Sequence, residues 1–547
     1  MMPNTQLRLL WHTVRHLRPI QVGARLWFRL YRPKVSTKPL PVFREAQFVW
    51  TRPSTRRQSQ FGPNTFRFIG ADGTLSDGWD DERREKLWRY NLHYFDDLNA
   101  RGASERIGWH EKLIERWVKE NRPGSGTGWE PYPTSLRIVN WIKWVLAGNR
   151  LPETAVSSLA TQARWLSRRL EYHLLGNHLF ANAKALVFAG VFFGGSEAES
   201  WLAKGCKILR TQLPEQILPD GGHFELSTMY HALALEDVLD LINLFGMFPQ
   251  IRSADAQMLL TVLPAYAQAM RRWLASMSHP DGGFAFFNDA AFGVAPSPQE
   301  LNAYADRLGL GQQQIQTGTI LLPDTGYIRL NAGPCVALID AARIGPDYQP
   351  GHAHADTLSF ELSFGTKRLL VNTGTSAYGS GAERLRQRGT AAHNTVVVAG
   401  ENSSEVWAGF RVARRAFPFG LRVEDQGGGT VVTCSHDGYM RLEGKPVHQR
   451  ILEFGPAGAT VLDSVKGGSH AAEARFHFHP DWTIATVGDG KCGTATIADG
   501  QFVKWEVECG EPRLDKSSYH PEFGVALPAT CLAVNLSSGR SRVRFIW

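Results

Sequence analysis

The sequence has few cysteines, and their spacing excludes a zinc-knuckle or redox pair. The six cysteines are scattered between Cys206 and Cys531, and none form a CxxC pair. We therefore expect free thiols, most of them buried, and nothing in the cysteine pattern requires an oxidising compartment.

Long hydrophobic runs are also missing. Apolar stretches near the N-terminus, such as LRLLW, are too short for a signal-peptide core or a membrane span. The expected location is therefore the bacterial cytoplasm or a membrane surface, with the periplasm or cell envelope as the alternative. The segment LRLLWHTVRHLRPIQVGARLWFRLY is basic and amphipathic, and no acidic residue precedes Glu45. It predicts either peripheral contact with an anionic membrane or a helix docked on its own domain.

Several catalytic signatures are absent as well. The chain has no GxSxG elbow, no HExxH, no Walker loop and no Rossmann GxGxxG that opens a helix. These absences argue against several large enzyme classes, and no organic cofactor is expected. With 60 Lys and Arg against 52 Asp and Glu, the chain permits a polyanionic partner. No nucleic-acid-binding motif accompanies the basic N-terminus, so nucleic acid is not an expected partner.

The first long region of the chain has a helical pattern. From about 80 to 300, apolar residues recur at intervals of three to four, separated by Gly, Pro and Asp. Two near-repeats, LPDGGHFELS (218–227) and HPDGGFAFFND (279–289), place the same Pro-Asp-Gly-Gly turn between helical segments. A recurring turn of this kind indicates stacked helix pairs, as in an (α/α) toroid.

The second long region is rich in short β-type runs. From about 320, segments such as TLSFELSFG and NTVVVAG alternate with Gly-rich turns. This pattern predicts an antiparallel β-sandwich. The expected fold is thus multidomain, α then β, with a basic N-terminal arm (1–60), an (α/α) toroid (61–310) and an antiparallel β-sandwich (311–547).

The stretch GHAHADTLSFEL (351–362) concentrates titratable groups at the start of an apolar run. If the stretch is a strand, His352 and His354 lie on the same face. That face is polar at the start of the strand, here called its mouth, and apolar further along, where the strand enters the core. We predict that this mouth faces the helical domain across a cleft. The spacing suits two different jobs, with one histidine in a cleft and the other tied into structure or a metal.

Two later residues can join His354 at a metal ion. Asn372 lies at the end of the run LLVN, and His393 directly precedes TVVVAG. His354, Asn372 and His393 form a candidate structural zinc site, although Asn brings no charge and is a poorer ligand than Asp.

The helical region supplies the complementary side chains. Asn177 and His178 stand at a helix start, and Tyr230 and His231 follow the first Pro-Asp-Gly-Gly turn. An amide, a tyrosine and histidines without a nucleophile suit proton abstraction next to a carboxylate. The amide and a protonated histidine hold the carboxylate, while tyrosine and histidine act as base and acid. That chemistry is β-elimination in a uronic-acid polymer.

The motifs NHLFANAKAL, DGGHFELSTMYH, GHAHADTLSFEL and TAAHNTVVV resemble the heparinase II/III family of polysaccharide lyases, including its alginate-lyase relatives. The resemblance spans roughly 80–450 and implies a toroid followed by a sandwich. It implies that Asn177 neutralises the uronate carboxylate and that His178 lines the same subsite. Tyr230 is the implied acid and base, and His352 faces the cleft.

The resemblance also implies a structural zinc, bound by His354, Asn372 and His393. The characterised lyases of this family carry Asp where this chain has Asn372, which weakens the zinc inference. Further groove residues are expected in three segments. They are Trp129, Tyr132 and Arg137 in the first, His231 in the second, and Tyr378, Arg384 and Arg388 in the third.

Three functions remain open at this point. The first is a polysaccharide lyase acting on an acidic polysaccharide, linked to bacterial exopolysaccharide or capsule metabolism. The second is a glycoside hydrolase, for which Glu130, Asp220, Glu225 and Asp281 are the candidate carboxylates. The third is a non-catalytic glycan-binding assembly protein.

Overall fold

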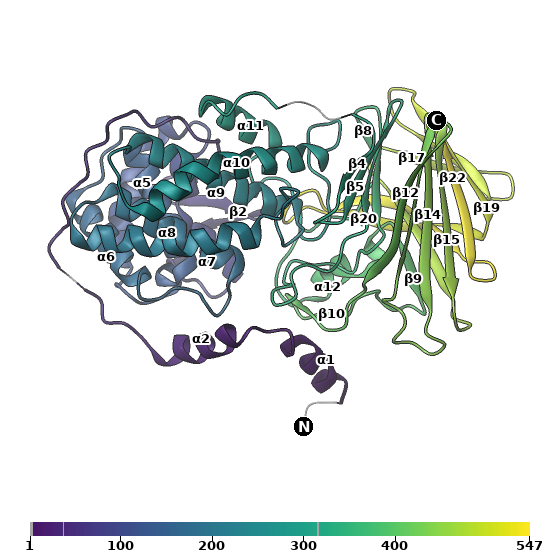
Figure 1. The fold of residues 1–547 in the computed structure, drawn as a ribbon, viewed down its shortest axis with the longest axis horizontal. Coiled ribbons are helices and arrows are strands. Elements are labelled where there is room, and N and C mark those ends of the chain that lie inside the picture. The colour runs from purple at the N-terminus through teal and green to yellow at the C-terminus, as the bar shows by residue number, and fades with distance from the viewer. Residues whose placement is uncertain (1–3, 37, 314–316) are drawn as a thin grey trace.

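The computed structural model describes residues 4–36, 38–313 and 317–547. A helical domain is followed by an antiparallel β domain, which confirms the predicted fold class (Figure 1). The last helix of the helical domain, α11 (Pro298–Arg307), ends shortly before the first strand of the β domain, β4 (Ile320–Leu322). Residues 1–3 of the predicted basic arm lie outside the described residues.

The helical domain is a toroid whose helices bury apolar stripes against one another. Helix α7 is the innermost, because almost every side chain along it is buried. Serine side chains accept N–H groups at the starts of α9, α10 and α11, which satisfies part of each exposed helix end. The toroid helices before α11 are α3 (Lys86–Tyr94), α4 (Ile107–Glu120), α5 (Pro131–Leu146), α6 (Glu153–Leu166), α7 (Gly176–Phe192), α8 (Ser196–Gln216), α9 (Thr228–Met247) and α10 (Ala254–Ser276).

The two Pro-Asp-Gly-Gly segments adopt the same turn. In each, the aspartate accepts the N–H two residues on, from Gly222 to Asp220 at 3.0 Å and from Gly283 to Asp281 at 2.8 Å. The first glycine of each turn has a positive φ, 94° in the first copy and 84° in the second. The chain then returns toward the β domain, so both turns lead residues into the contact between the two domains.

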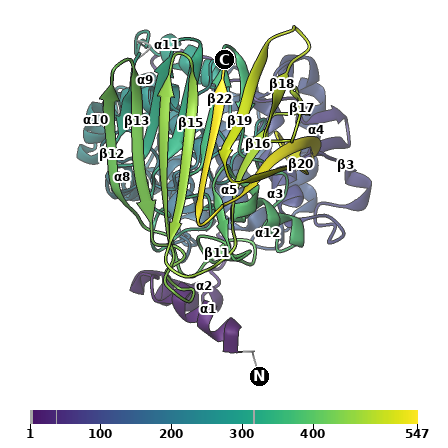
Figure 2. The same cartoon turned by 90° about the vertical axis from the view of Figure 1, so that its right-hand side faces the viewer.

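The β domain is a sandwich of two antiparallel sheets. The eight-stranded sheet has the order β12-β13-β14-β15-β22-β19-β18-β17 and lies on the outside (Figure 2). The other sheet has the order β20-β21-β16-β8-β7-β6-β5-β4, with β9 on β16, and faces the toroid (Figure 1). Alternating burial along β14 and β15 matches the period of two expected of strands with one buried face.

Both sheets mix short and long strands, from three residues in β4 to nine in β20 and β21 of the inner sheet and from five in β17 and β18 to nine in β14 of the outer one. The inner strands are β4, β5 (Tyr327–Ala332), β6 (Cys335–Asp340), β7 (Phe360–Phe364), β8 (Lys367–Leu370), β9 (Val396–Val398), β16 (Ala472–Phe478), β20 (Glu511–Tyr519) and β21 (Leu527–Asn535). The outer strands are β12 (Pro418–Gln426), β13 (Gly429–His436), β14 (Val447–Gly455), β15 (Gly458–Lys466), β17 (Thr483–Val487), β18 (Cys492–Thr496), β19 (Phe502–Cys509) and β22 (Arg540–Ile546).

Smaller elements complete the fold. Helices α1 (Asn4–Val14) and α2 (Pro19–Leu30) lie along one edge of the molecule (Figure 1). A small sheet packs beside the toroid, and a hairpin and a short helix lie in the β domain near the domain contact. They are β1 (Gln60–Gly62), β2 (Thr65–Phe68), β3 (Ala71–Thr74), β10 (Val406–Trp407), β11 (Arg411–Val412) and α12 (Ala382–Arg388). Among the described residues, no helix has both the length and the apolar character needed to cross a membrane.

Candidate active site

A cleft of about 590 Å³ lies where the toroid meets the sandwich. Helix α5 contributes Tyr132 to its wall, α7 contributes Asn177 and α9 contributes Tyr230. Tyr378 enters from the β domain, in the loop before α12. The cleft therefore collects three of the predicted aromatic residues and the predicted amide.

Tyr230 and His352 are in direct contact across the domain boundary. Their rings stack with centroids 3.8 Å apart, and the Tyr230 hydroxyl lies 3.1 Å from the Tyr378 hydroxyl. Burial, together with Tyr378, raises the pKa of Tyr230 well above its ordinary value. The phenol is therefore protonated in the free protein, and the predicted juxtaposition of the two side chains is present.

A buried carboxylate that was absent from the predicted site, Asp289, anchors this arrangement. It accepts hydrogen bonds from His352 Nδ1 at 2.8 Å and His354 Nε2 at 2.9 Å, and it pairs with Arg384. Burial alone would raise the pKa of Asp289, but Arg384 and the two imidazoles hold it well below its ordinary value. Asp289 is thus ionised, and it fixes the protonated nitrogen of each histidine that faces it.

The only sequence signal for Asp289 was its place at the end of the second near-repeat. The polar pair Asn288-Asp289 there follows four apolar or small residues. Asn288 also contributes, because its Oδ1 accepts the backbone N–H of His354 at 3.0 Å. Arg384 and Arg388 were expected to reach the substrate, but both are buried in helix α12.

The segment around His352 is a loop, which corrects the predicted strand. Strand β7 begins only at Phe360. The loop is held by Arg388, whose Nη2 donates to the carbonyl of Ala353 at 2.8 Å. The side chain of His352 is 12% exposed and that of His354 only 1%. The two histidines have the different surroundings that were expected, although the cause is the loop and not strand alternation.

Asn177 and His178 begin helix α7 beside the cleft. Asn177 Oδ1 is buried without a hydrogen-bond partner, while His178 Nδ1 lies 3.2 Å from Glu171 Oε1 and its ring packs on Tyr132. Burial disfavours the charged form of His178, but Glu171 outweighs it and raises the pKa of the imidazole. This end of the cleft combines a neutral amide and a histidine that favours its cationic form.

Glu225 is a second carboxyl that the predicted site lacked. Its Oε2 lies 3.6 Å from His352 Nε2, on the opposite side of the ring from Asp289. The side chain is buried, neither oxygen makes a hydrogen bond of normal geometry, and burial raises its pKa. Glu225 therefore favours its neutral form more than an ordinary glutamate does.

Four predicted groove residues lie in the interior instead. His231 Nε2 bonds to the carbonyl of Met270, and Arg388 bonds to the loop that carries His352. Trp129 and Arg137 are fully enclosed in the toroid core, where Arg137 lies over the ring of Trp117. These side chains support the site by packing, and their burial removes them from direct contact with a ligand in the cleft.

The candidate metal ligands also gather in the interior. The rings of His354 and His393 are 5.2 Å apart, and His393 Nδ1 lies 3.1 Å from Asn372 Oδ1. His354 Nδ1 and His393 Nε2 are buried without hydrogen-bond partners. Within the described ranges, no three His, Cys, Asp or Glu side chains form a group suited to a metal. The two unpartnered imidazole nitrogens are the atoms available to a divalent ion here, whereas Asn372 Oδ1 contacts the other nitrogen of His393.

Carboxylates of this chain neutralise the lysines and arginines of the cleft. Lys143 and Lys184 lie 2.9 Å and 2.7 Å from Asp240 at the floor, and Lys184 also pairs with Asp237. The three arginines of the lining pair in the same way. The pairs are Arg56–Glu236, Arg57–Glu522 and Arg67–Asp72.

A helical toroid that faces the inner sheet of a β-sandwich, with Tyr230 and His352 stacked where they meet, defines a toroid-and-sandwich protein. The chain belongs to the heparinase II/III family. Residues 81–306 match the family's Heparinase II/III N-terminus, and residues 315–545 match its Heparinase II/III-like, C-terminal region.

Curated relatives agree with this assignment. A heparin-sulfate lyase of Bacteroides stercoris is 26% identical over 363 residues, which cover 62% of this chain and 51% of that protein. A heparin-sulfate lyase of Pedobacter heparinus is 26% identical over 271 residues, covering 45% of this chain and 39% of that protein. The chain matches only about half, or less, of the length of these relatives.

Solved structures show the same fold. Heparinase III superposes with a TM-score of 0.66 at 18% identity, covering 97% of this chain and 85% of that chain. A heparan sulfate lyase from Pedobacter heparinus gives a TM-score of 0.58 at 17% identity, covering 96% and 87%.

Proposed function

We propose that this protein is a polysaccharide lyase that cleaves a uronic-acid-containing polymer by β-elimination. The observation that carries the proposal is the stacked pair of Tyr230 and His352, fixed by Asp289 and placed beside Asn177 and His178. The heparin-sulfate lyases among the relatives support the same reaction class.

The residues fit the steps of the reaction. Asn177 and the cationic form of His178 hold the uronate carboxylate, which stabilises negative charge as the C5 proton leaves. Because Asp289 accepts the Nδ1 proton of His352, Nε2 of the same ring is the basic nitrogen and takes the C5 proton. The electron pair of the C5–H bond forms the C4–C5 double bond, and the C4–O bond breaks. Tyr230, protonated in the free protein, donates its proton to the leaving oxygen.

The charges of the cleft favour a substrate that carries carboxylates but no sulfate. Each lysine or arginine of the described cleft lining is already paired with a carboxylate. Sulfate groups would therefore have to compete with internal ion pairs for every cation. An unsulfated bacterial exopolysaccharide or capsule polymer fits this cleft better than a heavily sulfated glycosaminoglycan.

Three of the four carboxylates expected for a glycoside hydrolase bind other groups of the protein. Asp220 binds the backbone and hydroxyl of Thr325, and Asp281 pairs with Arg368. Glu130 bonds to Tyr90 at the edge of the toroid. Only Glu225 reaches the site, and it faces the imidazole of His352 instead of a second carboxyl across a bond.

We also propose that His354, His393 and Asn372 hold a structural zinc. The buried, unpartnered nitrogens His354 Nδ1 and His393 Nε2 support this assignment. Zinc bound there would supply rigidity to the loop that carries His352. The neutral amide of Asn372 predicts weaker binding than a carboxylate at the same position.

We place the protein in the cytoplasm or at a membrane surface, where such polymers are assembled. The exposed apolar and basic side chains of the N-terminal helices support peripheral membrane contact.

Purified protein should be tested on polyglucuronate, alginate, heparosan, heparan sulfate and the host strain's own exopolysaccharide. Elimination creates a 4,5-unsaturated uronate, which is followed by near-ultraviolet absorbance. We expect a rise with an unsulfated polymer, its loss in Tyr230→Phe and its retention in Tyr266→Phe, a tyrosine on α10 outside the cleft. New reducing ends without absorbance would identify a hydrolase, and binding without cleavage an assembly protein.

A further inference from the structure

The N-terminal helices are attached to the body through inward contacts, among them hydrogen bonds from Arg169 to the carbonyls of Phe28 and Tyr31. On α2, Gln21 Nε2 donates to the carbonyl of Tyr348 at 3.3 Å, and the ring of Phe28 packs on His173 with centroids 4.1 Å apart. On α1, the hydroxyl of Thr13 accepts from Trp407 Nε1 at 3.0 Å. These contacts orient both helices and determine which of their faces point outward.

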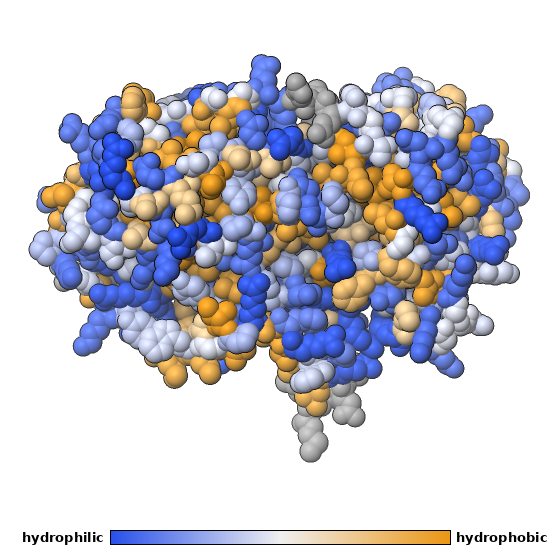
Figure 3. All heavy atoms as spheres, in the orientation of Figure 1, coloured by the Kyte–Doolittle hydropathy of each residue, from blue (hydrophilic) through white to orange (hydrophobic). Residues whose placement is uncertain are grey.

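The outward faces are apolar, which is unusual for the surface of a globular domain. Each helix carries an exposed stripe with the spacing of successive helical turns. The stripes are Leu7, Trp11 and Val14 on α1, and Val22, Leu26 and Leu30 on α2. Trp11 is 65% exposed and Leu30 is 82% exposed. Figure 3 shows apolar side chains along the lower edge, where Figure 1 places the two helices.

Positive charge surrounds these stripes without internal compensation. No acidic residue precedes Glu45 in the sequence. Among the described residues, only Arg18 of the first 36 forms an ion pair, with Glu215. The exposed cations on or next to the two helices are Arg8, Arg15, Arg25, Arg29, Arg32 and Lys34.

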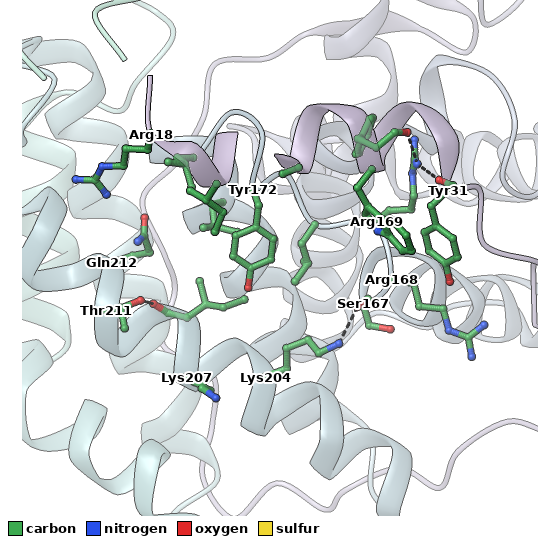
Figure 4. Close-up of a pocket in the computed structure, with 18 residues that line it drawn as sticks. Arg18, Tyr31, Ser167, Arg168, Arg169, Tyr172, Lys204, Lys207, Thr211 and Gln212 are labelled. Atoms are coloured by element: carbon green, nitrogen blue, oxygen red, sulfur yellow. Dashed lines mark hydrogen bonds between the residues drawn. The ribbon is translucent and has the colours of Figure 1, made fainter. Parts of the chain in front are cut away.

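A second pocket of about 590 Å³, here called the α2 pocket, lies between α2 and the toroid. Its walls include Ile20, Trp27 and Ile208, and none of the described residues that line it carries a carboxylate. Figure 4 shows Lys204 and Lys207 on the far side of the pocket from α2. An apolar interior with a basic rim is complementary to an acyl chain beneath an anionic headgroup.

We propose that α1, α2 and the α2 pocket form one docking surface for an anionic lipid bilayer. The helices have 11 and 12 residues, so they lie in the plane of the interface instead of crossing it. The stripes enter the acyl boundary, and the arginines meet the headgroups. A soluble polyanion would use the arginines but would leave the leucine and valine stripes in water, which is why we favour a bilayer.

The test is co-sedimentation of the full chain with vesicles of phosphatidylcholine, with and without phosphatidylglycerol. We expect at least tenfold stronger binding to the anionic vesicles, and weakening of that binding by salt. The double variant Leu26→Glu/Leu30→Glu keeps every arginine and should lose at least tenfold in binding. Met258→Glu, at an exposed apolar position on α10, is the matched control and should bind like the parent chain.

A second variant separates the charge contribution. Arg25→Gln/Arg29→Gln keeps both stripes and should bind anionic vesicles severalfold more weakly, with a shallower salt dependence. Equal melting temperatures would show that the exposed substitutions leave the fold intact. Absence of vesicle binding would overturn the proposal. Equal binding to both vesicle types, or full binding by the leucine variant, would overturn it as well.

Discussion

Asp289 binds two histidines, one on its cleft side and one on its interior side, and the two lie in different surroundings. On the cleft side, the carboxylate holds His352, which is partly exposed and stacks on Tyr230. On the interior side, it holds His354, which is buried beside His393. One alanine separates the two histidines in the sequence, yet one lies at the cleft and the other is enclosed in the interior.

Because His352 and His354 are the same residue type, the difference between them comes from how deeply each side chain is buried. Both imidazoles donate to the same ionised carboxylate. For His354, burial dominates and lowers the pKa to about 4, so this ring stays neutral near pH 7. His352 keeps its second nitrogen near the cleft, toward Glu225. Asp289 thus binds one histidine at the cleft and one in the interior.

Tyr230→Phe should reduce activity at the cleft side of Asp289 without changing the interior side. It removes the proton donor but keeps the ring that stacks on His352, so we expect kcat to fall by roughly 10²–10⁴-fold. The melting temperature should change little, because the lost contact is only the 3.1 Å bond to Tyr378. Initial rates of product absorbance and a thermal melt measure the two effects. Retention of full activity would contradict the role of Tyr230.

Asp289→Asn should damage both sides together. The substitution leaves Arg384 buried without its carboxylate, and breaking a buried ion pair of this kind costs about 3–5 kcal/mol. We also expect a large fall in kcat, because the amide no longer fixes the Nδ1–H tautomer of His352. Chemical denaturation and initial rates measure the two losses. A variant with normal stability would show that Asp289 is not the common anchor.

Asn372→Asp should change the interior side alone. If zinc occupies the site, a charged ligand should tighten its binding by about tenfold or more and raise the melting temperature. If no metal binds, the new carboxylate is buried without a partner and the melting temperature should fall. Metal analysis by mass spectrometry and melts with and without a chelator separate the two outcomes. Cleft residues are unchanged in this variant, so kcat serves as the internal control.

The fold was predictable because its patterns are repetitive. Three-to-four spacing identified the toroid, and short runs between Gly-rich turns identified the sandwich. The sequence also indicated Tyr230 and His352 as residue types suited to one reaction, and their roles stay a prediction. Their contact was not derivable, since it joins helix α9 to a loop more than a hundred residues away in sequence.

The missed residues have a common physical cause. Asp289 acts through a buried ion pair with Arg384, and no local pattern in the sequence predicts that pair, because each looks like an ordinary polar residue in a loop. Arg137 and His231 were wrongly predicted to line the groove, because their side chains are polar. Their burial with internal partners becomes visible only when the toroid closes around them.

Glu171→Gln should alter how the cleft side responds to pH. Glu171 raises the pKa of His178, so the cation persists to higher pH than in an ordinary histidine. If that cation holds the uronate, KM should rise severalfold as pH increases through the pKa of His178. Removing the carboxylate lowers this pKa, so the rise in KM should begin at lower pH in the variant. Profiles of KM against pH, with kcat recorded alongside, test the shift, and superimposable profiles would contradict it.

Glu522→Gln should produce the smallest effect and tests the charge of the cleft mouth. The Arg57–Glu522 pair is exposed, so its loss should change stability by less than about 1 kcal/mol. The freed Arg57 becomes available to an anion, and we expect kcat/KM for heparan sulfate to rise severalfold relative to unsulfated heparosan. The Arg544–Glu506 pair on the distant outer sheet provides a control, because Glu506→Gln should leave this ratio unchanged. An unchanged ratio in Glu522→Gln would show that internal ion pairing at the mouth does not select against sulfate, and would leave substrate choice to the deeper pairs of Lys143 and Lys184.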